Sequence, residues 1–275
     1  MLLFIAFTIE MQISHRFHNL PELFFTQAEK SHLKIPTYSF VTLNMICIFA
    51  KHKHIINMKN EVDGRREIAS RNTVWATIIA RKLTRWGITP NQISMMSIFF
   101  AMVGCLLLIG TVIDPGFNKY VAYILFIVCM QSRLLCNLFD GMVAIEGGKK
   151  SANGDLYNDM PDRFADALFI IPVGYAAGGF GIELGWMAAL LAVMTAYFRW
   201  IGAYKTHQHF FNGPMAKQHR MALLTLAFVV ATCTIHAGYD RMVCLIALII
   251  INVGLVATLI HRLYLMSHTT NNEIK

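Results

Sequence analysis

Six long apolar runs, separated by short polar connections, limit what this chain can fold into more than any other feature. A helix needs about 20 apolar residues to cross a bilayer, and only helices and closed barrels satisfy their own backbone hydrogen bonds within lipid. Charged residues make up 15% of the chain, against about 25% in a typical soluble domain. We therefore predict an all-α, polytopic membrane protein with six transmembrane helices, at residues 91–113, 119–141, 160–179, 182–203, 220–238 and 241–264.

An amphipathic helix is expected just before the first run, in the sequence VWATIIARKLTRW at residues 74–86. The side chains of its apolar face are Trp75, Ile79, Leu83 and Trp86. Such a helix can lie in the membrane interface with its tryptophans at headgroup level, although the pattern also suits a helix packed on protein. Gly87 is expected to end this helix, and Thr89 or Asn91 to cap the next one.

Basic residues concentrate in alternate connections between the runs. One set of connections and ends holds Lys149, Lys150, Lys205, Lys217, Arg220, Arg262 and Lys275, and the other set holds Lys119 and Arg241. By the positive-inside rule, both termini and the stretch 137–166 are expected on the cytoplasmic side, at the inner membrane if the protein is bacterial. The formal net charge of +8 then reflects basic flanks that face anionic lipid, so we expect no nucleic-acid partner.

Four segments are expected along the chain. Residues 1–57 carry no sustained helical period and no credible span. We expect them to be a poorly ordered extension, or to be absent from the native protein if translation begins at Met58. Residues 58–90 are expected to form a cytoplasmic segment with the amphipathic helix, 91–265 the six-helix membrane domain, and 266–275 a cytoplasmic tail.

Carboxylates and amides gather at the two ends of the stretch 137–166, NLFDGMVAIEGGKKSANGDLYNDMPDRFAD. Helical spacing places Asn137 and Asp140 on one face of the second span, and Asn158 and Asp162 on one face of the third. Adjacent antiparallel helices would bring the four together, at a depth where unpaired carboxylates repel each other and are costly. A divalent cation removes both costs, and oxygen ligands without nearby His or Cys suit Mg²⁺ or Mn²⁺.

Small residues occur in the same stretch, at Gly141, Ala144 and Gly154. They would let a bulky ligand approach the backbone, and with two intervening lysines and an oxygen-ligated metal they favour a nucleotide diphosphate. Taken singly, each polar residue here is also typical of an ordinary helix end that faces water. Pro161 predicts a kink or a helix start just before Asp162, because proline lacks the backbone N–H.

The stretch resembles the signature of the CDP-alcohol phosphatidyltransferase family, in which D-x-x-D-G-x-x-A-R is followed, eight residues later, by G-x-x-x-D-x-x-x-D. With the same spacing, it reads Asn137-x-x-Asp140-Gly141-x-x-Ala144-Ile145, eight residues, then Gly154-x-x-x-Asn158-x-x-x-Asp162. The amphipathic helix, the six runs and GPMAKQHR after the fourth run also resemble the family. Two aspartates of the signature are Asn here and its arginine is Ile, which indicates a divergent subgroup with altered metal chemistry.

The resemblance implies a transferase of phospholipid biosynthesis that moves a phosphatidyl group from CDP-diacylglycerol to a polar alcohol and releases CMP. It implies Asp162 as the general base, a homodimer, and Mg²⁺ or Mn²⁺ as the cofactor, with one ion or two left open by the asparagines. The implied metal ligands are Asp140, Asn137, Asn158 and Asp162. The residues implied to let the nucleotide approach are Gly141, Ala144 and Gly154.

Basic residues in or beside the spans are further candidates for the site. An intramembrane cation usually marks a function, so Arg199 and Lys217 are candidates to bind an anionic acceptor or the diphosphate. Arg133, in the middle of the second run, could pair with a carboxylate instead. Lys205 and Arg220 are equally well explained as anchors that face the membrane surface.

Two alternative functions remain at this point. One is a catalytically weakened relative that binds CDP-lipid without turning it over. The other is a small membrane transporter, which would place polar residues on several central helices at mid-depth. Because the carboxylates gather at one face of the membrane, the sequence favours chemistry at the interface.

Overall fold

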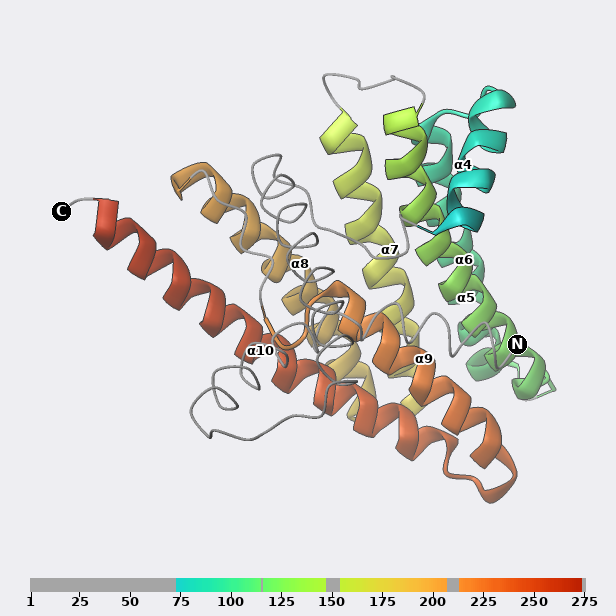
Figure 1. Ribbon diagram of the computed structural model, residues 1–275. Coiled ribbons are helices and arrows are strands. Elements are labelled where there is room, and N and C mark those ends of the chain that lie inside the picture. The colour runs from blue at the N-terminus through green and yellow to red at the C-terminus, as the bar shows by residue number, and fades with distance from the viewer. Residues whose placement is uncertain (1–72, 115, 147–153, 207–212, 274–275) are drawn as a thin grey trace, which may run out of the picture. The chain divides into compact units, whose positions relative to one another are not determined.

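The structure is a computed structural model that describes residues 73–114, 116–146, 154–206 and 213–273 (Figure 1). These residues are helical apart from short connections, and no strand occurs among them. The expected all-α fold is therefore confirmed for this part of the chain. The expected extension 1–57, and residues 58–72 after it, lie outside the described residues.

Seven α-helices follow one another along the described residues. Their bounds are α4 Val74–Arg85, α5 Pro90–Ile113, α6 Lys119–Glu146, α7 Gly154–Ala177, α8 Gly181–Thr206, α9 Lys217–Thr234 and α10 Asp240–Glu273, with a 3-10 helix η2, Ile235–Ala237, after α9.

Five of the described helical stretches are long and apolar enough to cross a membrane. They are α5, α6, α8, α9 with η2, and α10, and they coincide with five of the six predicted runs. This supports the expectation of a helical membrane protein with several spans. α7 coincides with the remaining run but is not among the five, because Asp and Arg side chains occupy its first half. That α7 also spans the membrane stays a prediction.

Several helices are longer than the runs that predicted them, α7 and α10 most of all. α7 begins at Gly154 and continues through Pro161, so of the two expectations for this proline the helix start was wrong and the kink stays a prediction. Pro161 lies in the third turn of α7, where its missing N–H removes one intrahelical hydrogen bond. α10 continues to Glu273, through most of the expected tail, since no Gly or Pro interrupts it after Tyr264.

The turn between α4 and α5 follows from local sequence as expected. Gly87 takes a positive φ of 74° just after α4, a conformation that glycine adopts without steric cost. Thr89, rather than Asn91, caps α5: its Oγ1 accepts from the backbone N–H of Gln92 at 3.3 Å, and the Gln92 side chain accepts from the N–H of Thr89 at 2.9 Å. This capping box sets where the first span begins.

α4 lies against α6 by a small-residue face rather than by its large apolar face. Ala76 and Ala80 are fully buried, and the Trp75 ring meets the edge of Phe139 at a centroid distance of 6.1 Å. Trp86, from the expected apolar face, is 65% exposed. The helix therefore packs on protein with one side and leaves a second apolar side open, and its position in the membrane interface stays a prediction.

The core that holds α7 in place is aromatic. The Phe126 ring of α6 contacts Phe169 of α7 and Phe228 of α9, at centroid distances of 5.5 and 4.4 Å. Gly104 of α5 leaves room for this stack, because a Cβ there would lie 2.9 Å from Phe169. The three helices that carry the candidate site therefore meet around one buried ring cluster.

α7 and α8 approach each other closely through glycines. A Cβ at Gly185 would lie 3.0 Å from Gly174 Cα, and a Cβ at Gly174 would lie 2.6 Å from the carbonyl oxygen of Gly181. Such contacts between small residues let helix backbones approach within a membrane, where packing rather than the hydrophobic effect drives association.

Gly185→Ala is expected to destabilise the protein by about 1–3 kcal/mol, because the added methyl group meets backbone that cannot rotate away. Thermal unfolding in detergent measures this. Gly110→Ala is the matched control, since its Cβ would meet only Phe117, at 3.7 Å. Equal stability of the two variants would show that the close contact does not limit the packing of α7 on α8.

Candidate active site

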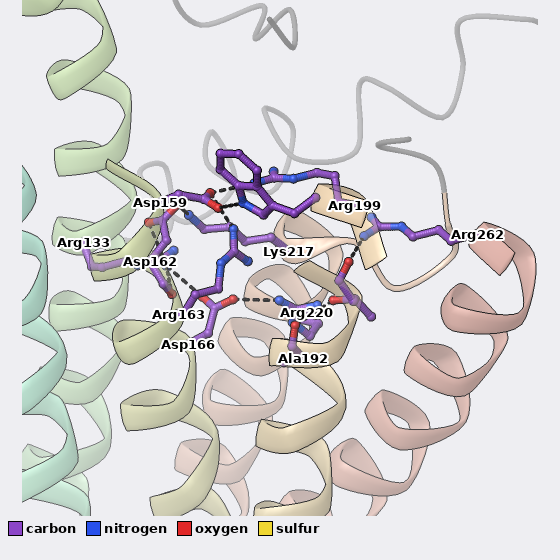
Figure 2. A network of polar contacts seen from close by, with 12 residues as sticks. Arg133, Asp159, Asp162, Arg163, Asp166, Ala192, Arg199, Lys217, Arg220 and Arg262 are labelled. Carbon is purple, nitrogen blue, oxygen red and sulfur yellow. Dashed lines mark hydrogen bonds and ion pairs between the residues drawn. The ribbon is translucent and has the colours of Figure 1, made fainter. Parts of the chain in front are cut away.

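A buried ion-pair network joins α6, α7 and α9 and contains the expected general base (Figure 2). Its members are Arg133, Asp162, Asp166, Lys217 and Arg220. We call these five residues the buried network.

Each carboxylate of the buried network is held by two cations. Arg133 Nη2 lies 2.8 Å from Asp166 Oδ1 and 3.3 Å from Asp162 Oδ1. Arg220 Nη2 lies 2.7 Å from Asp166 Oδ2, and Lys217 Nζ forms an ion pair with Asp162 Oδ2. The side chains of Arg133, Asp166 and Arg220 are at most 2% exposed. Charges this deeply buried are tolerated only when paired, so the network fixes the relative positions of the three helices.

The segment before α9 positions Lys217 and Arg220. The backbone N–H of Met215 donates to Thr258 Oγ1 on α10 at 2.9 Å, and the Met215 carbonyl accepts from Arg220 Nη1 at 3.2 Å. Gly254 of α10 gives Met215 its space, since a Cβ there would lie 2.6 Å from Met215 Cε. α10 thereby determines where the two cations of α9 point.

Asp140, near the end of α6, has a different environment from the carboxylates of the buried network. It is 3% exposed, and it accepts hydrogen bonds from Ser94 Oγ at 3.1 Å and from the backbone N–H of Gly141 at 2.5 Å. No lysine or arginine of the described residues forms an ion pair with it, yet it lies within electrostatic range of Asp162 and Lys217. Asp140 is therefore a buried carboxylate whose charge no directly bound cation balances.

A second cluster lies between α7 and α8, and Figure 2 shows it beside the buried network. Asp159 accepts from Arg163 Nη2 at 2.7 Å, from Arg199 Nη2 at 2.6 Å and from the indole N–H of Trp200 at 2.6 Å. We call these four residues the Asp159 cluster. An open groove next to it has mainly apolar walls, with Met160, Val193, Ala196 and Tyr197 among its lining residues.

The predicted site residues are brought together in part. Asp140, Asp162 and Lys217 lie in one neighbourhood, as expected. Asn137, one helical turn before Gly141 on α6, has a buried amide nitrogen with no hydrogen-bond partner among the described residues. Arg199 is elsewhere, because it binds Asp159 rather than Asp162.

For the remaining predicted residues, the position along a helix is what the structure gives. Gly141 and Ala144 belong to the last turns of α6, and Gly154 is the first residue of α7. Asn158 lies in the first turns of α7, and its side chain is outside the described residues.

The role expected for Arg133 is confirmed, and the role expected for Arg220 is not. Arg133 pairs with carboxylates, as the sequence suggested it could. Arg220 is not a surface anchor, since it is 1% exposed and bound to Asp166. The signal that could have identified Asp166 is its spacing of four from Asp162, which places both side chains on one helix face.

A divalent cation such as Mg²⁺ needs several oxygen ligands close together. Asp140 lacks a cationic partner, and Asn137 and Asp162 carry oxygens of the right type, but both oxygens of Asp162 are in ion pairs with Arg133 and Lys217. No three Asp, Glu, His or Cys side chains of the described residues are placed to hold a metal. The described donors are therefore of the type that an oxygen-ligated ion takes, but they do not form a complete site on their own.

The arrangement of helices is a CDP-alcohol phosphatidyltransferase fold. It is similar to the crystal structure of Mycobacterium tuberculosis phosphatidylinositol phosphate synthase (PgsA1) with CDP-DAG bound, with a TM-score of 0.56, 16% identity, and coverage of 70% of this chain and 92% of that chain. No family model matches the chain. No curated protein matches it either. At this identity the likeness concerns the fold alone, and it supports the fold expected from the signature.

Proposed function

We propose that this protein is a CDP-alcohol phosphotransferase of phospholipid biosynthesis. It would transfer a phosphatidyl group from CDP-diacylglycerol to an alcohol and release CMP. The observation that carries the proposal is that the buried Asp140 of α6 lies within electrostatic range of Asp162 of α7, two carboxylates at the spacing of the family signature. The solved structure of similar fold has CDP-DAG bound, which supports the donor substrate.

Asp162 is the proposed general base. Its side chain is 16% exposed, so it is the carboxylate of the buried network that an acceptor hydroxyl can reach. As the hydroxyl oxygen forms its bond to the β-phosphorus, Asp162 takes the hydroxyl proton and the bond to the CMP oxygen breaks. A positioned base contributes about 10²–10⁴ in rate.

Lys217 is the proposed contact for the diphosphate or for an anionic acceptor. Its ammonium group is 24% exposed and already contacts Asp162, so it can neutralise a phosphate oxygen beside the base. Arg199 remains a candidate for the acceptor, at the Asp159 cluster. Gly141, Ala144 and Gly154 are proposed to let the nucleotide approach the backbone.

The proposed cofactor is Mg²⁺ or Mn²⁺, held by Asp140 and Asp162 with the amide oxygens of Asn137 and Asn158. Such an ion would supply positive charge for the diphosphate. We further propose that the active site and both termini face the cytoplasm, and that the protein is a homodimer, both on the basis of the sequence resemblance and the distribution of basic residues.

The test is the release of CMP from labelled CDP-diacylglycerol by membranes that hold the protein. Mg²⁺ or Mn²⁺ and a panel of alcohols are added, including glycerol 3-phosphate, an inositol phosphate and serine, and the lipid product is identified. We expect CMP release that depends on one of these acceptors. Absence of CMP release with every acceptor, for a correctly folded protein, would contradict the proposal.

A second candidate function is binding of CDP-lipid without turnover. The observation in its favour is that Arg133 and Lys217 engage both carboxylate oxygens of Asp162. Binding of CDP-diacylglycerol without CMP release in the same assay would support this function instead.

Asp140→Asn is expected to reduce CMP release to less than about a tenth of the wild-type rate, because it removes the one carboxylate left free for a cation. It should also abolish any stabilisation of the protein by Mn²⁺, which thermal unfolding in detergent reports. Asp114→Asn, an exposed carboxylate in the turn after α5, is the control. A variant at Asp140 that keeps wild-type turnover would remove this residue from the site.

A further inference from the structure

The polar centre of the bundle has no excess of negative charge among its ion pairs. Two carboxylates, Asp162 and Asp166, are paired with the three cations Arg133, Lys217 and Arg220, and Asp140 lies within electrostatic range of Asp162 and Lys217. All six side chains come from the described part of α6, α7 and α9. A divalent cation added to this partly desolvated centre would leave an uncompensated positive charge, which is costly in a medium of low dielectric constant.

Arg133 is the member that makes this balance. It lies on α6 one helical turn before Asn137, so both side chains share a face of the helix. Its guanidinium is fully buried, and its Nη2 donates to Asp162 and Asp166 together. Its Nε and Nη1 have no hydrogen-bond partner among the described residues. Arg133 thus binds one oxygen of each of two carboxylates, and those two oxygens are held by protein.

Asn137 and Asn158 also reduce the negative charge of the site. The signature that this chain resembles has carboxylates at positions 137 and 158, and the chain has neutral amides there. The loss of two negative charges and the presence of a buried guanidinium one turn away act in the same direction. Both reduce the positive charge that the site must take up from solution.

We propose that Arg133 is a built-in counter-ion that takes the place of one divalent metal ion. The chain then binds no more than one divalent cation, near Asp140, and binds it tightly only together with an anionic diphosphate, whose charge restores neutrality. The proposal rests on the proposed function for the identity of the diphosphate, and on the ion pairs of the described residues for the rest.

The experiment counts Mn²⁺ bound to the purified full chain in detergent, by the loss of the free-ion electron paramagnetic resonance signal, with and without CDP as a soluble probe. For the wild type we expect at most one Mn²⁺ per chain, bound roughly tenfold or more tightly when CDP is present. Two Mn²⁺ per chain without CDP would overturn the proposal, and this measurement needs no variant.

Arg133→Met should bind Mn²⁺ without CDP roughly tenfold or more tightly than the wild type, because it leaves the polar centre with a net negative charge. Arg133→Lys, which keeps the charge, should behave as the wild type does. Lys119→Met is the matched control: it removes the cation that lies 3.0 Å from the buried Asp240, far along α6 from Asp140, and should leave Mn²⁺ affinity unchanged. Unchanged Mn²⁺ affinity in Arg133→Met would overturn the proposal.

This experiment measures Mn²⁺ binding and not CMP release, so its outcome is independent of the transferase activity. If the protein proves to lack transferase activity but shows the expected Mn²⁺ binding, the proposed function fails and the role of Arg133 stands. If CMP is released and two Mn²⁺ bind without CDP, the proposed function stands and the role of Arg133 fails.

Discussion

Asp162→Asn is expected to lower the rate of CMP release by about 10²–10⁴, the contribution of a positioned general base. The amide keeps the shape of the side chain and can still accept a hydrogen bond from Arg133 or Lys217, but it cannot take the proton of the acceptor hydroxyl. Binding of CDP-diacylglycerol should persist, because the fold retains the ion pairs of Asp166. The measurements are CMP release at saturating acceptor and donor binding by the same membranes.

Asp159→Asn is the control for that variant. Asp159 lies on the same helix, three residues before Asp162, but it contacts the cations of α7 and α8 instead of Lys217. Its substitution should change turnover far less. If Asp162→Asn retained a rate close to that of the wild type while Asp159→Asn lost it, the base would have been assigned to the wrong carboxylate.

Asp166→Asn is expected to have the largest effect on stability, a loss of about 3–5 kcal/mol. The variant leaves the guanidinium groups of Arg133 and Arg220 buried at 0% and 1% exposure with their shared carboxylate removed. An unpaired buried charge costs more than the pair contributes. Thermal or detergent-induced unfolding of the purified protein measures the loss.

Asp159→Asn serves again as the control, because Asp159 also binds two arginines, Arg163 and Arg199. Its side chain is 21% exposed, against 2% for Asp166. Water can hydrate the arginines that remain, so we expect a loss of about 1 kcal/mol or less. Similar losses for the two variants would show that burial of the ion pairs does not determine their contribution.

The apolar runs predicted the helices well, because membrane thickness and backbone hydrogen bonding leave few alternatives to a helix of that length. Local chemistry also predicted the turn at Gly87 and a cap at Thr89. The ends of α7 and α10 were missed because they extend beyond the apolar runs, where hydropathy carries no signal. Pro161 lies inside α7, so the helix start expected there was wrong, and the alternative expectation, a kink, stays a prediction.

The sequence predicted which carboxylates belong to the candidate site, but it did not predict which cation forms an ion pair with each of them. Spacing along one helix placed Asp140 and Asp162 near a common boundary, and it placed Asp162 and Asp166 on one face. Which cation reaches which carboxylate depends on how α6 and α9 rotate against α7, and residue spacing within one helix does not determine that. The sequence therefore suggested that Arg133 pairs with a carboxylate but not with which one, and the pairing of Arg220 with Asp166 followed only from the structure.

The ion pairs of Asp166 have a consequence for how this chain enters the membrane during synthesis. α7 is not apolar enough to favour insertion by composition alone, and its charged first half would be costly in lipid. Arg133 precedes Asp166 by 33 residues and is synthesised before it, whereas Arg220 follows 54 residues later. Arg133 of α6 is therefore available to pair with Asp166 as α7 is synthesised, and Arg220 of α9 completes the ion pairs of Asp166 later.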